Sequence, residues 1–223
     1  MKYTDSLSRF FRGNKYFYYI YFLCLIAGAF VFATIDKGDM VLWLNGSHTP
    51  FLDKFFLYTT FVGDGLFFAA VIIILLFWRI RYSIVGLVVF ASSGLMTQLL
   101  KRIFDMPRPR GVLAESAIHF VEGATLYHHH AFPSGHTTTA FALFLFLSAI
   151  IPAKYVGPLF AVLAVVVAFS RVYLAQHFYM DIYFGSMVGV GMATLIMAAF
   201  MKSGNLRRAG WQDRSIIEVI RRK

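Results

Sequence analysis

Three clusters of polar residues stand out in a chain that is otherwise strongly apolar. They carry the side chains that phosphate chemistry uses, namely cations, two histidines and one carboxylate. Each cluster lies at the end of a predicted membrane span, so the fold can bring all three together at one end of a helical bundle. The clusters are Lys101 with Arg108-Pro109, then Pro133-Ser134-Gly135-His136, then Ser170-Arg171 with His177 and Asp181.

Positive charge gathers where a phosphate group would need it. Lys101, Arg108 and Arg171 supply fixed cations, and the planar fork of an arginine side chain matches phosphate oxygens. Ser134 and Gly135 directly precede a predicted helix, whose first backbone N–H groups lack partners inside the helix and favour an anion. These five residues predict a phosphate-binding cradle.

Two histidines and an aspartate supply the reactive groups. His177 and Asp181 are four residues apart, which places them on one face of a helix. A carboxylate that accepts a hydrogen bond from one ring nitrogen fixes the tautomer and leaves the other nitrogen free to attack. His136 comes from a different span and is suited to protonate the leaving oxygen. This set predicts in-line phosphoryl transfer through a phosphohistidine, with the cations stabilising the transition state.

These motifs resemble those of the type 2 phosphatidic acid phosphatase (PAP2) superfamily, which also includes vanadium haloperoxidases and bacterial lipid phosphatases. Every defining position of the three family motifs is matched between residues 101 and 181. The resemblance implies a PAP2/haloperoxidase-like helical bundle that hydrolyses lipid phosphates or diphosphates without a metal or other cofactor. The single carboxylate agrees with this, because a magnesium centre usually needs several.

The resemblance also implies a role for each of eight residues. His177 would be the nucleophile, Asp181 its partner and His136 the acid for the leaving group. The phosphate would be held by Lys101, Arg108, Ser134, Gly135 and Arg171. Within the family, the phosphatidylglycerophosphatase B and undecaprenyl-diphosphatase classes are favoured.

The composition is that of a membrane protein. Hydrophobic residues make up 59% of the chain and charged residues only 14%, a balance that a water-soluble surface could not tolerate. A spanning helix needs about 20 mostly apolar residues. We therefore predict an all-α integral membrane protein with six transmembrane helices. The predicted spans are Tyr16–Ile35, Gly65–Trp78 with the apolar Phe55–Gly63 upstream, Tyr82–Leu100, Thr137–Ala153, Tyr155–Ser170 and Ile182–Met201.

The spans divide the chain into a cytoplasmic N-terminal segment (1–15), a six-span phosphatase domain (16–201) and a basic cytoplasmic tail (202–223). The first span has the basic flank of a signal peptide, but its length favours a retained helix. Apolar residues between 52 and 59 recur at helical spacing, which predicts a short amphipathic helix at the interface, with an ordinary loop as the alternative.

The distribution of Lys and Arg predicts the orientation. With six spans, both termini share one side, and that side carries 14 of the 21 Lys and Arg residues. We therefore predict a multi-pass protein of the bacterial inner membrane, with cytoplasmic termini and an active site that faces the periplasm or exterior. The net charge of +10 is assigned to topology and lipid phosphate, because no nucleic-acid fold signature is present.

Several alternatives remain open. Phosphatidylglycerophosphate, phosphatidate, undecaprenyl diphosphate and the phosphates of lipid A present the same group, and the phosphoryl group could pass to an acceptor other than water. A non-catalytic lipid-binding protein and a haloperoxidase are rival classes, disfavoured by the complete motifs and by the apolar spans. His128, His129 and His130 invite a metal-binding interpretation, but adjacent histidines on a loop point in different directions. The expected partners are the substrate and membrane lipids; the oligomeric state is not determined.

Overall fold

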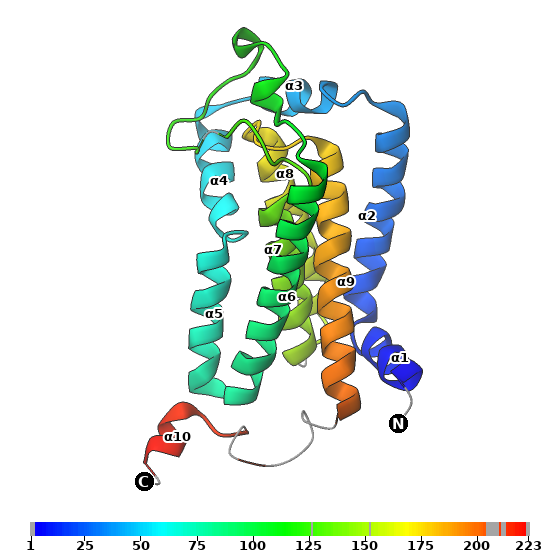
Figure 1. The fold of residues 1–223 in the computed structure, drawn as a ribbon, viewed down its shortest axis with the longest axis vertical. Coiled ribbons are helices and arrows are strands. Elements are labelled where there is room, and N and C mark those ends of the chain that lie inside the picture. Colours follow the sequence, from blue (N-terminus) through cyan, green and yellow to red (C-terminus); the bar gives the residue numbers. More distant parts are fainter. Residues whose placement is uncertain (1–2, 126, 152, 204–209, 211–212, 222–223) are drawn as a thin grey trace.

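Long apolar helices run side by side along one axis of the computed structural model (Figure 1). The structure describes residues 3–125, 127–151, 153–203, 210 and 213–221, and no strand occurs among them, so the predicted all-α class is confirmed. The helices of the bundle are α2 (Lys15–Thr34), α4 (Pro50–Phe61), α5 (Gly65–Trp78), α6 (Ile80–Phe104), α7 (Gly135–Ile150), α8 (Val156–Tyr173) and α9 (Tyr179–Ser203).

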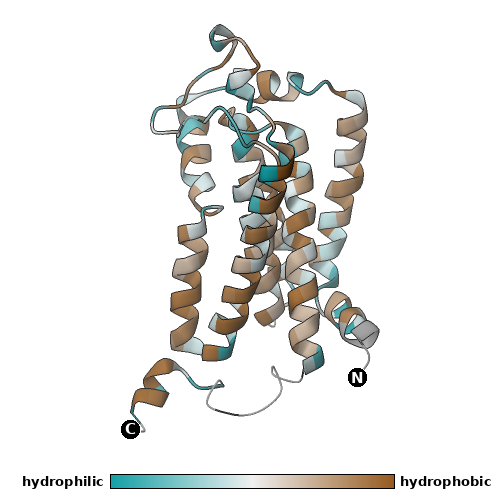
Figure 2. Ribbon diagram, viewed as in Figure 1, coloured by the Kyte–Doolittle hydropathy of each residue, from teal (hydrophilic) through white to brown (hydrophobic). Residues whose placement is uncertain are grey.

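Side chains on the outside of the bundle are apolar along most of its length (Figure 2). Large hydrophobic residues such as Ile26, Phe30, Ile74 and Leu95 are more than half exposed. An aqueous surface would not carry so many, whereas hydrocarbon solvates them well. Polar residues collect instead in the loops at the end of the bundle that bears α3 (Asp39–Gly46). The molecule is therefore a membrane protein. Polar residues also lie at the opposite end, which carries Arg79, Arg81 and Lys202, but the end that bears α3 has the long polar loops and is called the polar end below.

The number of spans depends on two unusual elements. Four helices, α2, α6, α8 and α9, are long and apolar enough to cross a membrane, and the count is five if α4 and α5, which are bent by 53°, are taken as one span. Residues 52–59 are helical as predicted, but they belong to α4 and to this bent pair and do not form a separate helix at the interface. The predicted span Thr137–Ala153 corresponds to α7, which has only 16 residues, so the count of six is not confirmed. Since α7 packs against α6, α8 and α9 and is buried along most of its length, it needs little lipid-facing surface.

Small helices lie at both ends of the bundle. The connection after α6 contains η1 (Pro109–Gly111) and η2 (Glu115–Ala117), whereas α1 (Tyr3–Gly13) and α10 (Ile216–Ile220) lie at the end opposite α3 (Figure 1). Neither α1 nor α10 was predicted. Within the predicted basic tail, Asp213 pairs with Arg81 at the start of α6. Residues 1–2, 204–209, 211–212 and 222–223 of the two predicted terminal segments lie outside the described residues.

Glycines allow α7 and α9 to approach closely. A Cβ atom on Gly185 would lie 2.9 Å from the Ser134 carbonyl oxygen, and one on Gly189 would overlap the Thr138 carbonyl oxygen. The Thr138 hydroxyl donates a hydrogen bond to the Gly185 carbonyl oxygen at 3.0 Å. Small residues four apart are a common device for close helix contact in membranes. This contact sets the position of the first turn of α7, where two predicted site residues lie.

Replacing Gly189 by valine is expected to separate α7 from α9 and destabilise the protein. The added side chain would overlap main-chain atoms that cannot move independently, and overpacking of this kind costs about 1–3 kcal/mol or more. Gly191→Val is the matched control, because a Cβ at Gly191 meets nothing within 4 Å. Thermal unfolding in detergent should show a clear loss for Gly189→Val only; equal melting temperatures would contradict the close contact.

Candidate active site

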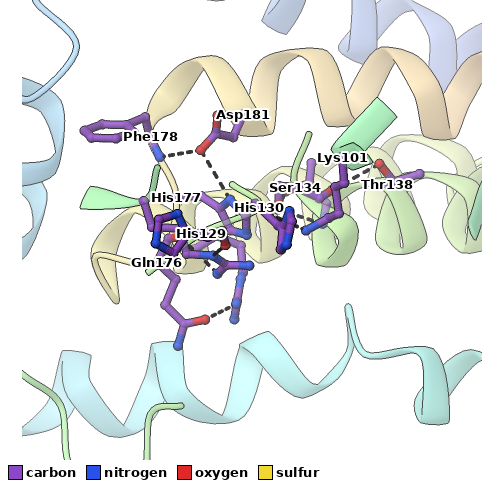
Figure 3. A network of polar contacts seen from close by, with 12 residues as sticks. Lys101, His129, His130, Ser134, Thr138, Gln176, His177, Phe178 and Asp181 are labelled. Atoms are coloured by element: carbon purple, nitrogen blue, oxygen red, sulfur yellow. Dashed lines mark hydrogen bonds and ion pairs between the residues drawn. The ribbon is translucent and has the colours of Figure 1, made fainter. Parts of the chain in front are cut away.

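Four helix ends meet at the polar end of the bundle. Lys101 lies in the last turn of α6 and Arg171 in the last turn of α8, while Ser134 caps α7 and Asp181 lies in the first turn of α9. Successive helices run in opposite directions, so these ends converge although they are far apart in sequence. The structure brings together all eight residues predicted for the site, several of which are seen in Figure 3.

His177 and Asp181 form a buried pair. The His177 Nδ1 atom lies 3.3 Å from Asp181 Oδ2, and each residue is about 1% exposed. The same carboxylate oxygen accepts a hydrogen bond from the Phe178 backbone N–H at 2.9 Å, which fixes its orientation (Figure 3). With Nδ1 directed at the carboxylate, the Nε2 atom of His177 is left for another partner.

The start of α7 is joined directly to the start of α9. The Ser134 hydroxyl accepts hydrogen bonds from the backbone and side chain of Thr137, which is typical of a helix N-cap. The Ser134 backbone N–H, which the sequence analysis directed toward an anion, donates instead to the Asp181 carbonyl oxygen at 3.0 Å. The anion-binding potential of this helix end therefore rests on Gly135 and the residues that follow it.

Lys101 and Arg108 are held by the connection between α6 and α7. The Lys101 ammonium donates to the His130 carbonyl oxygen at 2.7 Å, and Arg108 Nε donates to the His129 carbonyl oxygen at 2.9 Å. The Arg108 backbone N–H donates to the His128 carbonyl oxygen at 2.9 Å. The three adjacent histidines thus orient two cations through their main chain. Among the described residues, no cluster of three metal-ligating side chains includes any of them.

Arg171 is the most deeply buried cation of the site. It is 3% exposed, and its guanidinium donates to the Thr60 hydroxyl of α4 and to the Gln176 side-chain oxygen. Its Nε atom is buried without a hydrogen-bond partner among the described residues. A donor left free beside two engaged ones suits an incoming phosphate oxygen.

Gln176 and Thr60 were missed by the sequence analysis. The Gln176 carbonyl oxygen accepts from Arg108 at 3.2 Å, its side-chain oxygen accepts from Arg171, and its side-chain nitrogen donates to the Thr125 carbonyl oxygen at 2.7 Å. Gln176 therefore connects both arginines to the loop above the site. Its place directly before His177 was the one sequence signal available. Thr60 gave none, since it comes from a helix outside the motifs.

His136 is more accessible than the buried pair. Its side chain is 30% exposed, and Nε2 lies 3.8 Å from Asp64 Oδ2. Asp64 also caps α5 by accepting from the Leu66 backbone N–H at 2.7 Å. A partly exposed imidazole near a carboxylate is well placed to exchange protons with a leaving group or water.

The surroundings of His177 keep its ring neutral. Burial lowers the pKa of the His177 imidazole well below its usual value near 6.5, and the positive charges of Arg108, Arg171 and Lys101 lower it further. A neutral ring retains the nitrogen lone pair that a nucleophile requires.

The lowered pKa of His177 predicts acid sensitivity of the fold. Below about pH 6.5 the unfolded chain protonates this histidine while the folded protein does not, so stability falls by about 1.4 kcal/mol per pH unit until the folded pKa is reached. Thermal unfolding in detergent between pH 7.5 and 5 should show this loss. The slope should be shallower for His177→Asn, and identical slopes would contradict the assigned pKa shift.

The fold and the site define a membrane-embedded helical bundle with a histidine–aspartate pair and three cations at one end. Residues 82–205 match the PAP2 superfamily, and because this is more than half of the chain, the protein belongs to that superfamily. The matched region includes α6 from its third residue, α7 to α9 and all eight predicted site residues. The first five helices, which contribute Thr60 and Asp64, lie outside it.

Two curated proteins and one solved structure show the range of relatives. A dihydrosphingosine 1-phosphate phosphatase of Schizosaccharomyces pombe is 31% identical over 65% of this chain, which spans 37% of that protein's length. A lipid A 4'-phosphatase of Porphyromonas gingivalis is 29% identical over 74% of this chain and 73% of its own. The PAP2-type phosphatidylglycerolphosphate phosphatase of Bacillus subtilis superposes with a TM-score of 0.62 at 23% identity, covering 86% of this chain and 98% of its own. The last comparison supports the fold alone.

Proposed function

We propose that this protein is a lipid phosphatase that works through a phosphohistidine at His177. One observation carries the proposal: a buried, neutral imidazole paired with Asp181 lies among three cations, Lys101, Arg108 and Arg171. A structural histidine would have no need of so many positive charges, since they destabilise its protonated form and offer it no bond. Phosphate bound to the cations would bring its phosphorus to the free Nε2 atom.

The proposed reaction has two steps. In the first, His177 Nε2 attacks phosphorus, an N–P bond forms, and the bond from phosphorus to the lipid oxygen breaks as His136 gives that oxygen a proton. In the second, neutral His136 takes a proton from water, whose oxygen attacks phosphorus and releases phosphate and His177. Asp181 holds the His177 ring and stabilises its charge in the intermediate.

The cations of the site would neutralise the phosphate charge, as metal ions do in many phosphatases. Arg171 and Arg108 present planar donors to the equatorial oxygens, and Lys101 adds a third charge. The helix end at Gly135 adds backbone donors. A magnesium ion would be repelled by these cations, and Asp181 already accepts from His177 and Phe178. We therefore expect turnover to be independent of metal.

A lipid substrate is supported by the setting of the site. An apolar groove between α2, α8 and α9, with a cavity volume of about 180 Å³, is lined by residues that include Tyr21, Gly28, Phe169, Tyr179 and Tyr183. Tyr179 belongs to the same first turn of α9 as Asp181. An acyl chain in the groove would leave its phosphate close to the cations. The named relatives act on lipid phosphates, which also favours this class.

The orientation of the protein in the membrane is inferred from its charge distribution, and the candidate substrates are inferred from its relatives. Both α1 and α10 lie at the end of the bundle opposite the site, and the excess of Lys and Arg on the terminal side favours cytoplasmic termini. The site would then face the periplasm or exterior of a bacterial inner membrane. Lipid A phosphates and phosphatidylglycerophosphate are the leading substrate candidates, ahead of phosphatidate and undecaprenyl diphosphate. Transfer of the phosphoryl group to another acceptor is the second candidate reaction.

Phosphate release from a panel of lipid phosphates and diphosphates tests the proposal. Purified protein in detergent with excess chelator is expected to release phosphate from one lipid class, and His177→Ala is expected to release none. Loss of activity in chelator that magnesium restores would overturn the metal-free reaction. Labelled phosphate found on a second lipid rather than in solution would assign the protein as a transferase.

A further inference from the structure

A second group of polar side chains lies near the polar end of the bundle, outside the three family motifs. His48 follows α3, Asp53 lies in the first turn of α4, and His119 lies in the connection between α6 and α7. One potential ligand atom from each lies within 4.8 Å of the other two. The His48 and His119 rings are stacked with centroids 3.7 Å apart, and His119 Nε2 is 2.9 Å from Asp53 Oδ2.

We infer that His48, Asp53 and His119 bind a zinc ion. Two imidazoles and one carboxylate are ligands that Zn²⁺ prefers, and a water molecule would complete a tetrahedral site. Magnesium and calcium are poorer candidates because they require six or more ligands, nearly all of them oxygen. None of the three residues takes part in the proposed phosphoryl transfer, so the zinc site is distinct from the active site.

Only a small movement would close the site around the metal. Zinc bonds of about 2.0–2.1 Å in a tetrahedron place ligand atoms about 3.3 Å apart. The His119 and Asp53 atoms, at 2.9 Å, are already near this spacing. His48 is exposed on the turn between α3 and α4, where its ring stacks on His119 and lies near Asp53. Its ring can therefore rotate out of the stack and supply the third ligand.

Buried partners hold two of the three ligands in place. The second oxygen of Asp53 accepts a hydrogen bond from the Tyr173 hydroxyl at 2.6 Å. Asn45, which is 0% exposed, accepts from the His119 backbone N–H at 2.7 Å and donates to the His119 and Tyr173 carbonyl oxygens. Metal sites characteristically orient their ligands through such outer hydrogen bonds.

The zinc ion would cross-link three segments beside the active site. His48 and Asp53 come from the α3–α4 region, His119 from the α6–α7 connection, and Asp53 contacts Tyr173 at the end of α8. Arg171 lies two residues before Tyr173 and contacts Thr60 of α4. Zinc binding would thus stabilise the helix ends that position Arg171, while contributing nothing to the chemical step.

Direct measurement of zinc binding tests the inference. The full chain in detergent, freed of metal by chelator and exchanged into buffer, is titrated with Zn²⁺ against a chromophoric indicator. We expect one zinc per chain and at least about a tenfold loss of affinity in both His48→Gln and His119→Gln. His128→Gln, in the same α6–α7 connection, should bind like the wild type. Saturating zinc should raise the melting temperature by about 3 °C, but not that of His48→Gln.

Two outcomes would overturn the inference. One is the absence of stoichiometric zinc uptake by the wild-type protein; the other is unchanged affinity in His48→Gln. The second variant matters because His48 has no hydrogen bond among the described contacts, so its replacement should leave the fold intact even if His119→Gln unfolds. No substrate is used in these measurements, so the result does not depend on the proposed phosphatase reaction.

Discussion

Replacing His177 by alanine is expected to reduce phosphate release at least about a thousandfold without unfolding the protein. No other described histidine has a ring that is buried, neutral and paired with Asp181, so no second group can take over the attack on phosphorus. The bonds from Asp181 to Phe178 and Ser134 do not involve the His177 ring, and they should maintain the junction of α7 and α9. Initial rates in detergent measure the loss.

The control for this prediction is His128→Ala. His128 is exposed, and only its backbone carbonyl contacts the site, so its replacement should change the rate little. Rapid quenching with a labelled lipid phosphate adds a positive test: label bound to wild-type protein should survive alkali and be lost in acid, as expected for a phosphohistidine. A His177→Ala variant with near-normal turnover, or with the same labelling, would remove the proposed nucleophile.

The positions of the helices followed from the sequence because charges mark where apolar segments end. The predicted span Gly65–Trp78 coincides with α5, and Tyr16–Ile35 differs from α2 by one residue at each end. The short central helix α7 was harder to assign as a span, because a helix buried inside a bundle need not be as long as the membrane is thick. The bend between α4 and α5 was also not predicted: Asp64 marks the break between the two apolar segments, but the residue types do not give the angle between the helices.

The residues that the structure brings together at the candidate site could be selected from the sequence because the chemistry of their side chains is explicit in residue type. His177 and Asp181 are four residues apart and do form a pair, but His177 lies in the bend before α9 and not on the same helix face, so the predicted geometry was wrong. What the sequence could not show is the set of neutral partners that hold the cations. Thr60 and the carbonyl groups of His129 and His130 act through positions that depend on tertiary packing. Every residue has a backbone carbonyl group, so the residue types do not show which carbonyls accept these hydrogen bonds.

Replacing Arg171 by lysine is expected to lower kcat/KM about 100-fold although the charge is retained. The arginine uses two nitrogens to hold Thr60 and Gln176 and keeps Nε free among buried groups. A lysine has a single ammonium group, so it cannot meet both neighbours and also donate to a phosphate oxygen in the same plane. Because phosphate is bound most strongly when charge shifts in the transition state, we expect kcat to fall as well as KM to rise.

The matched control is Arg102→Lys, since Arg102 lies in the last turn of α6 beside Lys101 but is exposed. That change should leave kcat/KM within about twofold of the wild type, as is usual for an exposed charge. Melting temperatures for both variants separate a loss of catalysis from a loss of fold. If Arg171→Lys were stable and fully active, a point charge would suffice at this position, and the proposed role of the guanidinium fork in binding the transition state would be wrong.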